Sequence, residues 1–227
     1  MNNKTAILIF ASSGQQEAFA KPFKSSALLF DELNLQTHQT VKATCLPYFH
    51  VSEKEQVGNS FAERFTNAIQ SIYSKGFDTV ITVGNDTPHL KSSQILQAAQ
   101  QLETKDIVLG PSLDGGFYLM GLKKSLFNAD TFLKLPWQTS RLSQSIFRII
   151  AANSISLYKL EVLSDIDSIS DIKNILQSKK QLTSRVKALL LNVLSEVKKT
   201  EDSYLHYYQH SLSNCYFNKG SPNLIHA

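Results

Sequence analysis

Residues 79–88 read Thr-Val-Ile-Thr-Val-Gly-Asn-Asp-Thr-Pro, a β-branched run that leads into a glycine and an acidic side chain. β-Branched residues favour strands, so we expect residues 79–83 to form one. Ligands of open α/β sheets bind beyond the carboxyl ends of such strands. A carboxylate there can reach a divalent cation, because Mg²⁺ prefers a few carboxylates together with phosphate oxygens. Asp86 is therefore a candidate metal ligand. The alternative is that it only caps the next turn.

Strands and helices are expected to alternate along the first 180 residues. Residues 6–10 (AILIF) are a continuous apolar run, which is typical of a strand buried on both faces. Further strands are expected at residues 41–49, 106–109, 117–122 and 155–162, and helices at 25–36, 59–74, 92–103, 139–152 and 168–178. This alternation predicts an α/β fold, a three-layer α/β/α sandwich around a mostly parallel sheet.

The composition changes to helix-forming residues after Lys180. Apolar residues recur there at helical spacing, and lysines and arginines supply the other face. The apolar positions are Leu182, Val186, Leu189, Val193 and Val197. The favoured interpretation is a helix packed on the domain, with a dimerisation helix or a membrane-surface helix as alternatives. We therefore expect a domain at residues 1–180 and a C-terminal helical extension at 181–227, packed on the domain or continuing it.

Composition excludes several classes of protein. The net charge of +4 is too small to indicate a nucleic-acid partner. Cys45 and Cys215 form no CxxC pair, so neither a zinc site nor a disulfide framework is expected, and lone thiols suit a reducing compartment. Residues 6–10 are too short an apolar run for a signal peptide, and no run approaches a transmembrane segment of about 20 residues. We expect a cytoplasmic protein.

A second candidate motif is Gly-Pro-Ser-Leu-Asp-Gly-Gly at residues 110–116, after an expected strand. Consecutive glycines let the backbone approach a ligand closely, which makes Gly115 and Gly116 candidate substrate contacts. Asp114 can position an acceptor hydroxyl or act as its general base. The alternative is a plain hairpin turn.

A third motif, Ser-Asp-Ile-Asp-Ser at residues 164–168, places two carboxylates between a strand and a helix. Ser168 and Asp171 have the spacing of a capping box at the start of that helix. The carboxylates of Asp86 and Asp167 together can hold one metal ion against a pyrophosphate group.

The single tryptophan, Trp137, lies in Leu-Pro-Trp-Gln-Thr-Ser-Arg at residues 135–141. An aromatic platform beside hydrogen-bonding side chains suits a sugar or a base, so Thr139, Ser140 and Arg141 are further substrate-binding candidates. The alternative is that the tryptophan anchors a loop to the core.

Taken in order, these motifs resemble a widespread bacterial family of GT-A-fold glycosyltransferases, some of which are linked to arsenosugar biosynthesis. The matching segments are residues 58–64, 84–90, 108–121, 136–140 and 165–168. The similarity spans residues 5–178.

This resemblance implies a GT-A fold of the nucleotide-diphospho-sugar transferase type, related to nucleotidyltransferases that process molybdenum cofactor or make CMP-sugars. It implies that Asp86 binds a divalent metal, Mg²⁺ or Mn²⁺, with Asp167 as the second metal contact and Asp165 as the alternative. It also implies that Asp114, Gly115 and Gly116 lie on the acceptor side.

The chain departs from the family pattern after the first strand. The family has a basic loop there that holds phosphates, whereas residues 11–24 read ASSGQQEAFAKPFK. Lys21 and Lys24 are expected to take over, because a phosphate needs a nearby cation more than a particular sequence. The candidate nucleotide- and phosphate-binding residues are Ala11, Ser12, Ser13, Lys21, Lys24 and Asn85.

The sequence thus predicts a metal-dependent glycosyltransferase with a nucleotide-diphosphate sugar as donor. One alternative is a nucleotidyltransferase on the same fold, which would release pyrophosphate from a nucleoside triphosphate. The other is a non-catalytic binding module that has lost the phosphate loop. The expected partner is a nucleotide or nucleotide sugar, and a homodimer is left open.

Overall fold

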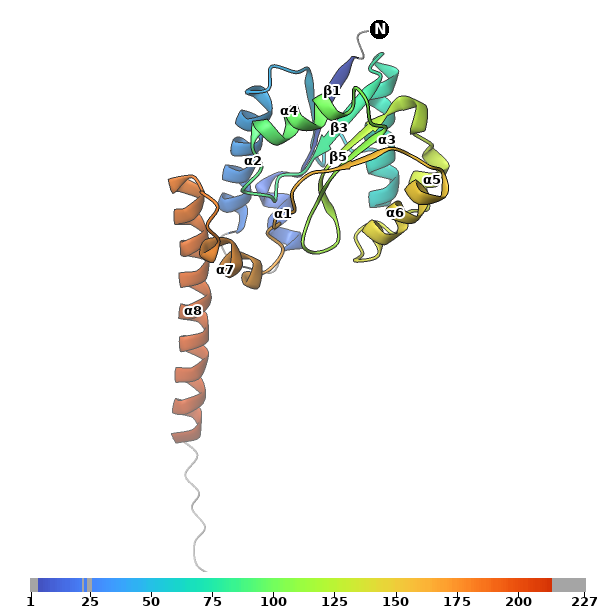
Figure 1. Cartoon of the computed structure of the whole chain (residues 1–227). Helices are drawn as coiled ribbons and strands as arrows, with labels where there is room; N and C mark the ends of the chain where they lie inside the picture. Colours follow the sequence, from blue (N-terminus) through green and yellow to red (C-terminus); the bar gives the residue numbers. More distant parts are fainter. Residues whose placement is uncertain (1–3, 22, 24–25, 214–227) are drawn as a thin grey trace, which may run out of the picture.

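The computed structural model describes residues 4–21, 23 and 26–213, with side chains described as far as Lys199. Figure 1 shows one sheet with helices on both faces. The elements are β1 (Thr5–Phe10), α1 (Gly14–Ala20), α2 (Ser26–Lys42), β2 (Tyr48–Val51), α3 (Phe61–Ser74), β3 (Thr79–Val83), α4 (Ser92–Gln101), β4 (Ile107–Pro111), β5 (Phe117–Lys123), the 3-10 helix η1 (Lys124–Leu126), α5 (Ala129–Leu133), α6 (Leu142–Ala152), β6 (Leu157–Lys159), α7 (Ile169–Gln177) and α8 (Ser184–Ser213).

The sheet has six strands in the order β2-β1-β3-β5-β4-β6. β1 is parallel to β2 and β3, and β4 is parallel to β6. Only β5 runs antiparallel to its two neighbours in this sheet. The expected α/β fold with a mostly parallel sheet is therefore confirmed. The carboxyl ends of β1, β3 and β4 meet the start of β5 at one edge.

Both faces of the sheet are buried, which explains the continuous apolar run of β1. Ala6 and Leu8 pack into a cluster with residues of α3 and α6. Ile7 and Ile9 point to the other face, where they meet Ile95 of α4. Because side chains alternate along a strand, a strand that is covered on both faces needs apolar residues at every position.

The expected strand at residues 41–49 is partly wrong. α2 continues to Lys42, and β2 begins only at Tyr48. Val41 is fully buried because it lies four residues after Thr37, on the buried face of α2. Cys45 then adopts a left-handed conformation, with φ of 58°, in the turn before β2. The first part of the expected strand is therefore the end of α2 and the turn that follows it.

Other boundaries also differ. β6 covers only Leu157–Lys159, less than the 155–162 expected. α6 begins at Leu142, three residues later than the helix expected from residue 139, and its N-cap Arg141 makes no capping side-chain bond. The capping box of Ser168 and Asp171 at the start of α7 is confirmed.

α1 is a short helix in the segment that the sequence left without structure. Ser13 caps it by accepting a hydrogen bond from the backbone N–H of Gln16. Gly14 lies against α2, where its N–H donates to Asp31 Oδ1 at 3.0 Å. A helix of seven residues with a polar sequence has no clear apolar period, which is why composition did not reveal it.

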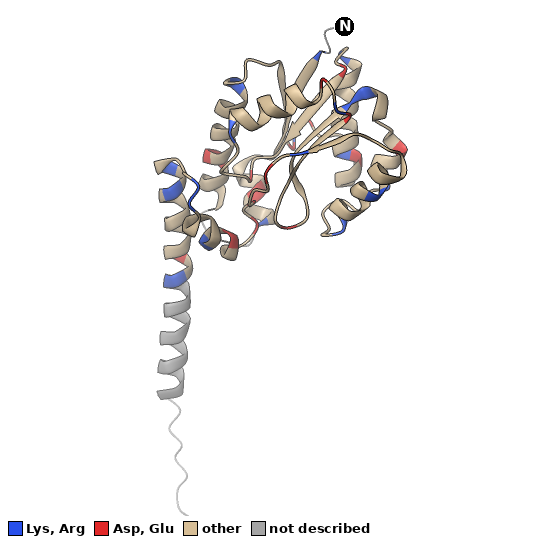
Figure 2. Cartoon of the chain, in the orientation of Figure 1, with Lys and Arg blue, Asp and Glu red and all other residues tan. Residues whose placement is uncertain are grey.

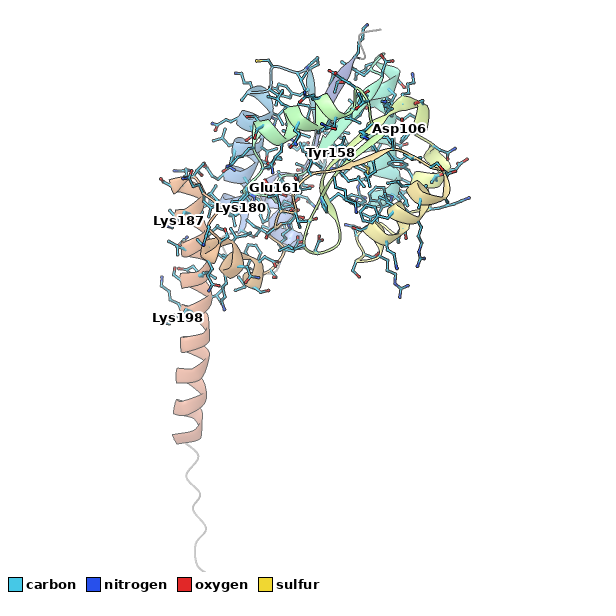
Figure 3. The ribbon with its side chains drawn as sticks, viewed as in Figure 1. Asp106, Tyr158, Glu161, Lys180, Lys187 and Lys198 are labelled. Atoms are coloured by element: carbon cyan, nitrogen blue, oxygen red, sulfur yellow. The ribbon has the colours of Figure 1, made fainter. Side chains whose placement is uncertain are left out.

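The first turns of α8 pack on α2 and α7 through Val186, Leu190 and Val193, which are buried. Figure 1 shows the rest of α8 extending beyond the sheet and its helices. Lys187 and Lys198 are directed away from the domain (Figure 3). The domain boundary expected near residue 180 stays a prediction, and residues 214–227 lie outside the described part. Among the described residues, no helix is long and apolar enough to cross a membrane.

We expect Gly14→Ala to lower the free energy of unfolding by about 1–3 kcal/mol, the usual range for overpacking. A Cβ at this position would lie 2.2 Å from Ala27 O and 2.4 Å from Asp31 Oδ1, so α1 would have to move away from α2. Urea denaturation measures the change, with Gln15→Ala on the exposed side of α1 as the control. An unchanged midpoint in Gly14→Ala would contradict this packing.

We expect Leu190→Ala to lower the free energy of unfolding by about 2–5 kcal/mol, because it empties a buried site between α8 and its neighbours. Leu190 is fully buried, whereas Leu191 is 50% exposed. The matched control is therefore Leu191→Ala, for which we expect a change within about 0.5 kcal/mol. Equal effects of the two substitutions in thermal and urea unfolding would show that α8 does not pack on the domain.

Candidate functional site

A pocket of about 610 Å³ opens at the edge of the sheet where β1, β3 and β4 end. Its volume lies in the usual range for ligand sites. One end of the pocket is charged and is lined by Glu17, Lys21, Asp86, Asp165 and Asp167. The other end is apolar and is lined chiefly by Phe10, Phe61, Phe65, Met120, Phe117 and Trp137.

Lys21 is the centre of the charged end. Its Nζ donates to Ile166 O at 2.6 Å and to Asp167 Oδ1 at 2.8 Å. Asp86 Oδ2 lies 3.5 Å away and Glu17 Oε2 lies 4.0 Å away. The Lys21 side chain is only 11% exposed. The ammonium group is therefore held between two carboxylates from separate segments of the chain, the loop after β3 and the segment before α7.

The fold brings these groups together through the backbone. Asp86 follows β3, and its carbonyl oxygen accepts a hydrogen bond of 2.9 Å from the N–H of Ile166. That bond ties the loop after β3 to the segment that leads into α7. Figure 2 shows acidic residues on α1 and on that segment at the same end of the sheet. Asp86 and Asp167, expected to act together, are thus brought into one cluster.

Two further carboxyl groups in this cluster are protonated more readily than usual. Burial, together with the charge of Asp86, raises the pKa of Asp165 to about 8, although its carboxylate accepts a hydrogen bond from Thr87 Oγ1. Burial raises the pKa of Glu17 to about 7, an effect that the charge of Lys21 partly offsets. Sequence reasoning missed Glu17, because α1 was not expected to form.

The pKa of Lys21 is raised. Burial alone would lower it, but the charges of Asp86 and Asp167 outweigh burial. The side chain therefore carries a full positive charge at neutral pH. It also lies over the ring of Phe30, with Nζ 4.6 Å from the ring centroid, which adds a cation–π contact.

The expected metal site fits these residues poorly as they are arranged, because Lys21 Nζ lies between Asp86 and Asp167. A divalent ion about 4 Å from an ammonium group is repelled by roughly 8 kcal/mol at an effective dielectric constant near 20. Among the residues that the structure describes, no group of three or more His, Cys, Asp or Glu side chains is placed to hold a metal ion. The metal-binding roles of Asp86 and Asp167 stay predictions.

The loop after β1 contributes less to the pocket than expected. Ala11 and Ser12 line it, but Ser13 does not. The N–H and hydroxyl of Ser13 donate instead to the carboxylate of Glu53, at 2.8 and 2.7 Å. Asn85 lines the pocket, and its amide donates to Asn34 Oδ1 at 3.0 Å. Lys24, the second expected phosphate contact, lies outside the described residues.

The turn between β4 and β5 places Asp114 and Gly116 on the pocket wall. Asp114 Oδ1 accepts a hydrogen bond of 2.8 Å from the N–H of Gly116, so this carboxylate also stabilises its own turn. Gly115 does not line the pocket. It has a φ of 94° and packs against the backbone of Ser140, which a side chain there would approach to 3.0 Å.

Trp137 lines the apolar end together with Thr139 and Ser140, whereas Arg141 is exposed and does not. The indole N–H donates to Phe132 O at 2.6 Å. Its ring centroid lies 5.0 Å from that of Phe65. The tryptophan therefore offers a ligand an aromatic surface and anchors its loop at the same time.

Arg64 is a pocket residue to which the sequence gave no role. It lies on α3, and its Nε donates to Gln56 Oε1 at 3.0 Å. Arg64 and Lys21 are the two cationic side chains among the described residues that line the pocket. The sequence feature that could have identified Arg64 is its place one turn into an amphipathic helix, on the side that also carries Phe61 and Phe65.

We expect the free energy of unfolding to fall as pH rises from about 5 to about 8, and Glu17→Gln to flatten this decline. The folded-state pKa of Glu17 is raised from 4.5 to about 7. The stability linked to this group is therefore complete below pH 4.5 and is lost as pH rises through 7. Urea denaturation at about pH 5 and at about pH 8 measures how far the free energy of unfolding falls between them. Glu103→Gln, at an exposed position, is the control, and a Glu17→Gln curve parallel to that of the wild type would contradict the assignment.

Comparison with solved structures supports the fold. A candidate nucleotide-diphospho-sugar transferase from Desulfovibrio desulfuricans G20 aligns with a TM-score of 0.74 and 20% identity, over 87% of this chain and 98% of the other. The bifunctional IspDF from Campylobacter jejuni aligns with a TM-score of 0.51 and 12% identity, over 75% of this chain and 53% of the other. A manganese complex of Rv0371C from Mycobacterium tuberculosis H37Rv aligns with a TM-score of 0.47 and 10% identity, over 77% of this chain and 99% of the other. The likeness to the Desulfovibrio structure shows that the chain has a fold of the nucleotide-diphospho-sugar transferase type.

The search of curated proteins found no match. A family model matches residues 25–139, which is about half of the chain and includes the loop after β3 and the turn between β4 and β5. The chain belongs to the family described as uncharacterized proteins conserved in bacteria (DUF2064).

Proposed function

We propose that the protein is a glycosyltransferase that binds a nucleoside-diphosphate sugar in this pocket and passes the sugar to an acceptor hydroxyl. The observation that carries the proposal is the ammonium group of Lys21, held at the carboxyl edge of the sheet on the wall of the pocket. A diphosphate is the part of such a donor that needs a fixed cation. The nucleotide-diphospho-sugar transferase type of fold supports the same class of ligand.

The two ends of the pocket match the two kinds of chemistry in such a donor. The charged end offers Lys21 to phosphate oxygens. The aromatic end offers the rings of Phe61, Phe65 and Trp137, on which a base or a sugar can stack. Arg64 on α3 adds a second cation for an anionic group of donor or acceptor.

In the proposed reaction the bond between the anomeric carbon and the diphosphate oxygen breaks, and its electron pair stays on the diphosphate. The positive charge of Lys21 stabilises that leaving group. The acceptor oxygen bonds to the anomeric carbon, and its proton passes to a carboxylate on the pocket wall, for which Asp114 is the candidate general base. The proposal includes a cytoplasmic location, since the lone cysteines suit a reducing compartment.

Two alternatives differ from this proposal in what they would release. A nucleotidyltransferase would join a nucleoside monophosphate to its acceptor and release pyrophosphate. A non-catalytic module would bind a ligand in the same pocket without turnover. Ser13, whose donors are occupied by Glu53, keeps the second alternative open, because it removes one expected phosphate contact.

We expect one nucleoside diphosphate, and sugars activated by it, to raise the melting temperature of the purified protein in a buffer with EDTA. A ligand at 100 times its Kd adds about 2.7 kcal/mol to the free energy of unfolding. Lys21→Met should weaken this binding at least about tenfold, because it removes a charge-assisted contact. Lys123→Met is the matched control, since Lys123 pairs with Asp106 and does not line the pocket.

Release of pyrophosphate from a nucleoside triphosphate, with no use of nucleoside-diphosphate sugars, would replace this proposal with nucleotidyl transfer. Absence of any nucleotide-dependent shift would favour the binding module. Equal nucleotide binding by wild type and Lys21→Met would remove the observation on which the proposal depends.

A further inference from the structure

Lys21 is held by several contacts inside the charged end of the pocket. An ammonium group has three N–H donors. Lys21 Nζ donates to Ile166 O at 2.6 Å and to Asp167 Oδ1 at 2.8 Å, and it forms an ion pair with Asp86 Oδ2 at 3.5 Å. The ring of Phe30 covers the same group from α2. A lysine that merely reached into the pocket from the surface would have neither these partners nor a side chain that is 11% exposed.

The surroundings of Lys21 also resemble those of a bound cation. Four carboxyl groups lie in this cluster, those of Glu17, Asp86, Asp165 and Asp167. Lys21 is the one cation among the described residues that forms ion pairs in this cluster, and its partners are Glu17, Asp86 and Asp167. The carboxylate oxygens of Asp86 and Asp167 converge on Nζ from different loops. A divalent ion would need these same oxygens at about 2.0–2.6 Å, in the space that the ammonium group occupies.

We propose that Lys21 is the resident cation of this site, that it keeps divalent metal ions out of the space between Asp86 and Asp167, and that it meets the anionic ligand in their place. The first two parts concern the protein alone. Only the last part depends on the proposed glycosyltransferase function. The proposal predicts that removal of the ammonium group turns the same carboxylates into a metal site.

The test is a titration of the protein with Mn²⁺ alone, without nucleotide, in which free Mn²⁺ is followed by its electron paramagnetic resonance signal. Wild type should have no saturable site tighter than roughly 1 mM, the range of weak carboxylate sites. Lys21→Met should bind one Mn²⁺ at least about tenfold more tightly. The double variant Lys21→Met/Asp86→Asn should lose this gain.

Lys123→Met is again the matched control, because it also removes one ammonium group from a carboxylate, that of Asp106, at 3.8 Å. Its Mn²⁺ binding should equal that of wild type. Circular dichroism and a cooperative thermal transition establish that each variant is folded. Equal Mn²⁺ binding by wild type and folded Lys21→Met would overturn the proposal.

A second result decides the matter even if Lys21→Met does not fold. Binding of Mn²⁺ by wild type with micromolar affinity, lost in Asp86→Asn, would show that the metal site coexists with Lys21 and would overturn the proposal. The titration contains no nucleotide, so its outcome does not depend on whether the protein uses a nucleotide sugar. Conversely, the melting experiments in EDTA test the nucleotide without a metal, so the two proposals fail separately.

Discussion

The contact between the ammonium group of Lys21 and the carboxylates of Asp86 and Asp167 organises the functional end of this protein. Lys21 and Asp167 are 146 residues apart in sequence, and Asp86 belongs to a third segment. The Lys21 side chain is 11% exposed but that of Asp167 is 50% exposed, so solvent screens part of the attraction between them. The arrangement therefore constrains α1, the loop after β3 and the segment before α7 at once.

The sheet makes this meeting of distant segments possible. β1 and β3 are parallel neighbours, so the segments that follow them leave at the same edge. The antiparallel β5 begins at that edge and brings the turn with Asp114 to the same pocket. Both faces of the sheet are covered by packed helices, so the loops at its edge are the part of the domain that is free to carry chemistry.

The pocket joins a charged wall to an aromatic wall, and the two walls have different origins. The charged residues come from loops and the short α1, where backbone hydrogen bonds such as Ile166 N–H to Asp86 O fix their positions. Phe61 and Phe65 of the aromatic wall come from α3, where their ring centroids stack at 5.6 Å, whereas Trp137 comes from the loop before α6. Those rings also pack in the core cluster with Ala6 and Leu8, so the shape of this wall depends on packing that also stabilises the fold.

Sequence by itself determined the alternation of strands and helices, the mostly parallel sheet, and Asp86 at the end of β3. Apolar runs and helical periods are local signals, and residues 79–83 carry them clearly. The tertiary structure determined the features that depend on residues far apart in sequence. It formed α1, which has too few residues for a visible period, and it placed Lys21 between two carboxylates. It also left Ser13, Gly115 and Arg141 off the pocket wall. Charges that are distant in sequence find their partners only through the packing of the whole sheet, and that is why the sequence predicted Lys21 as a phosphate contact but not its position between the carboxylates of Asp86 and Asp167.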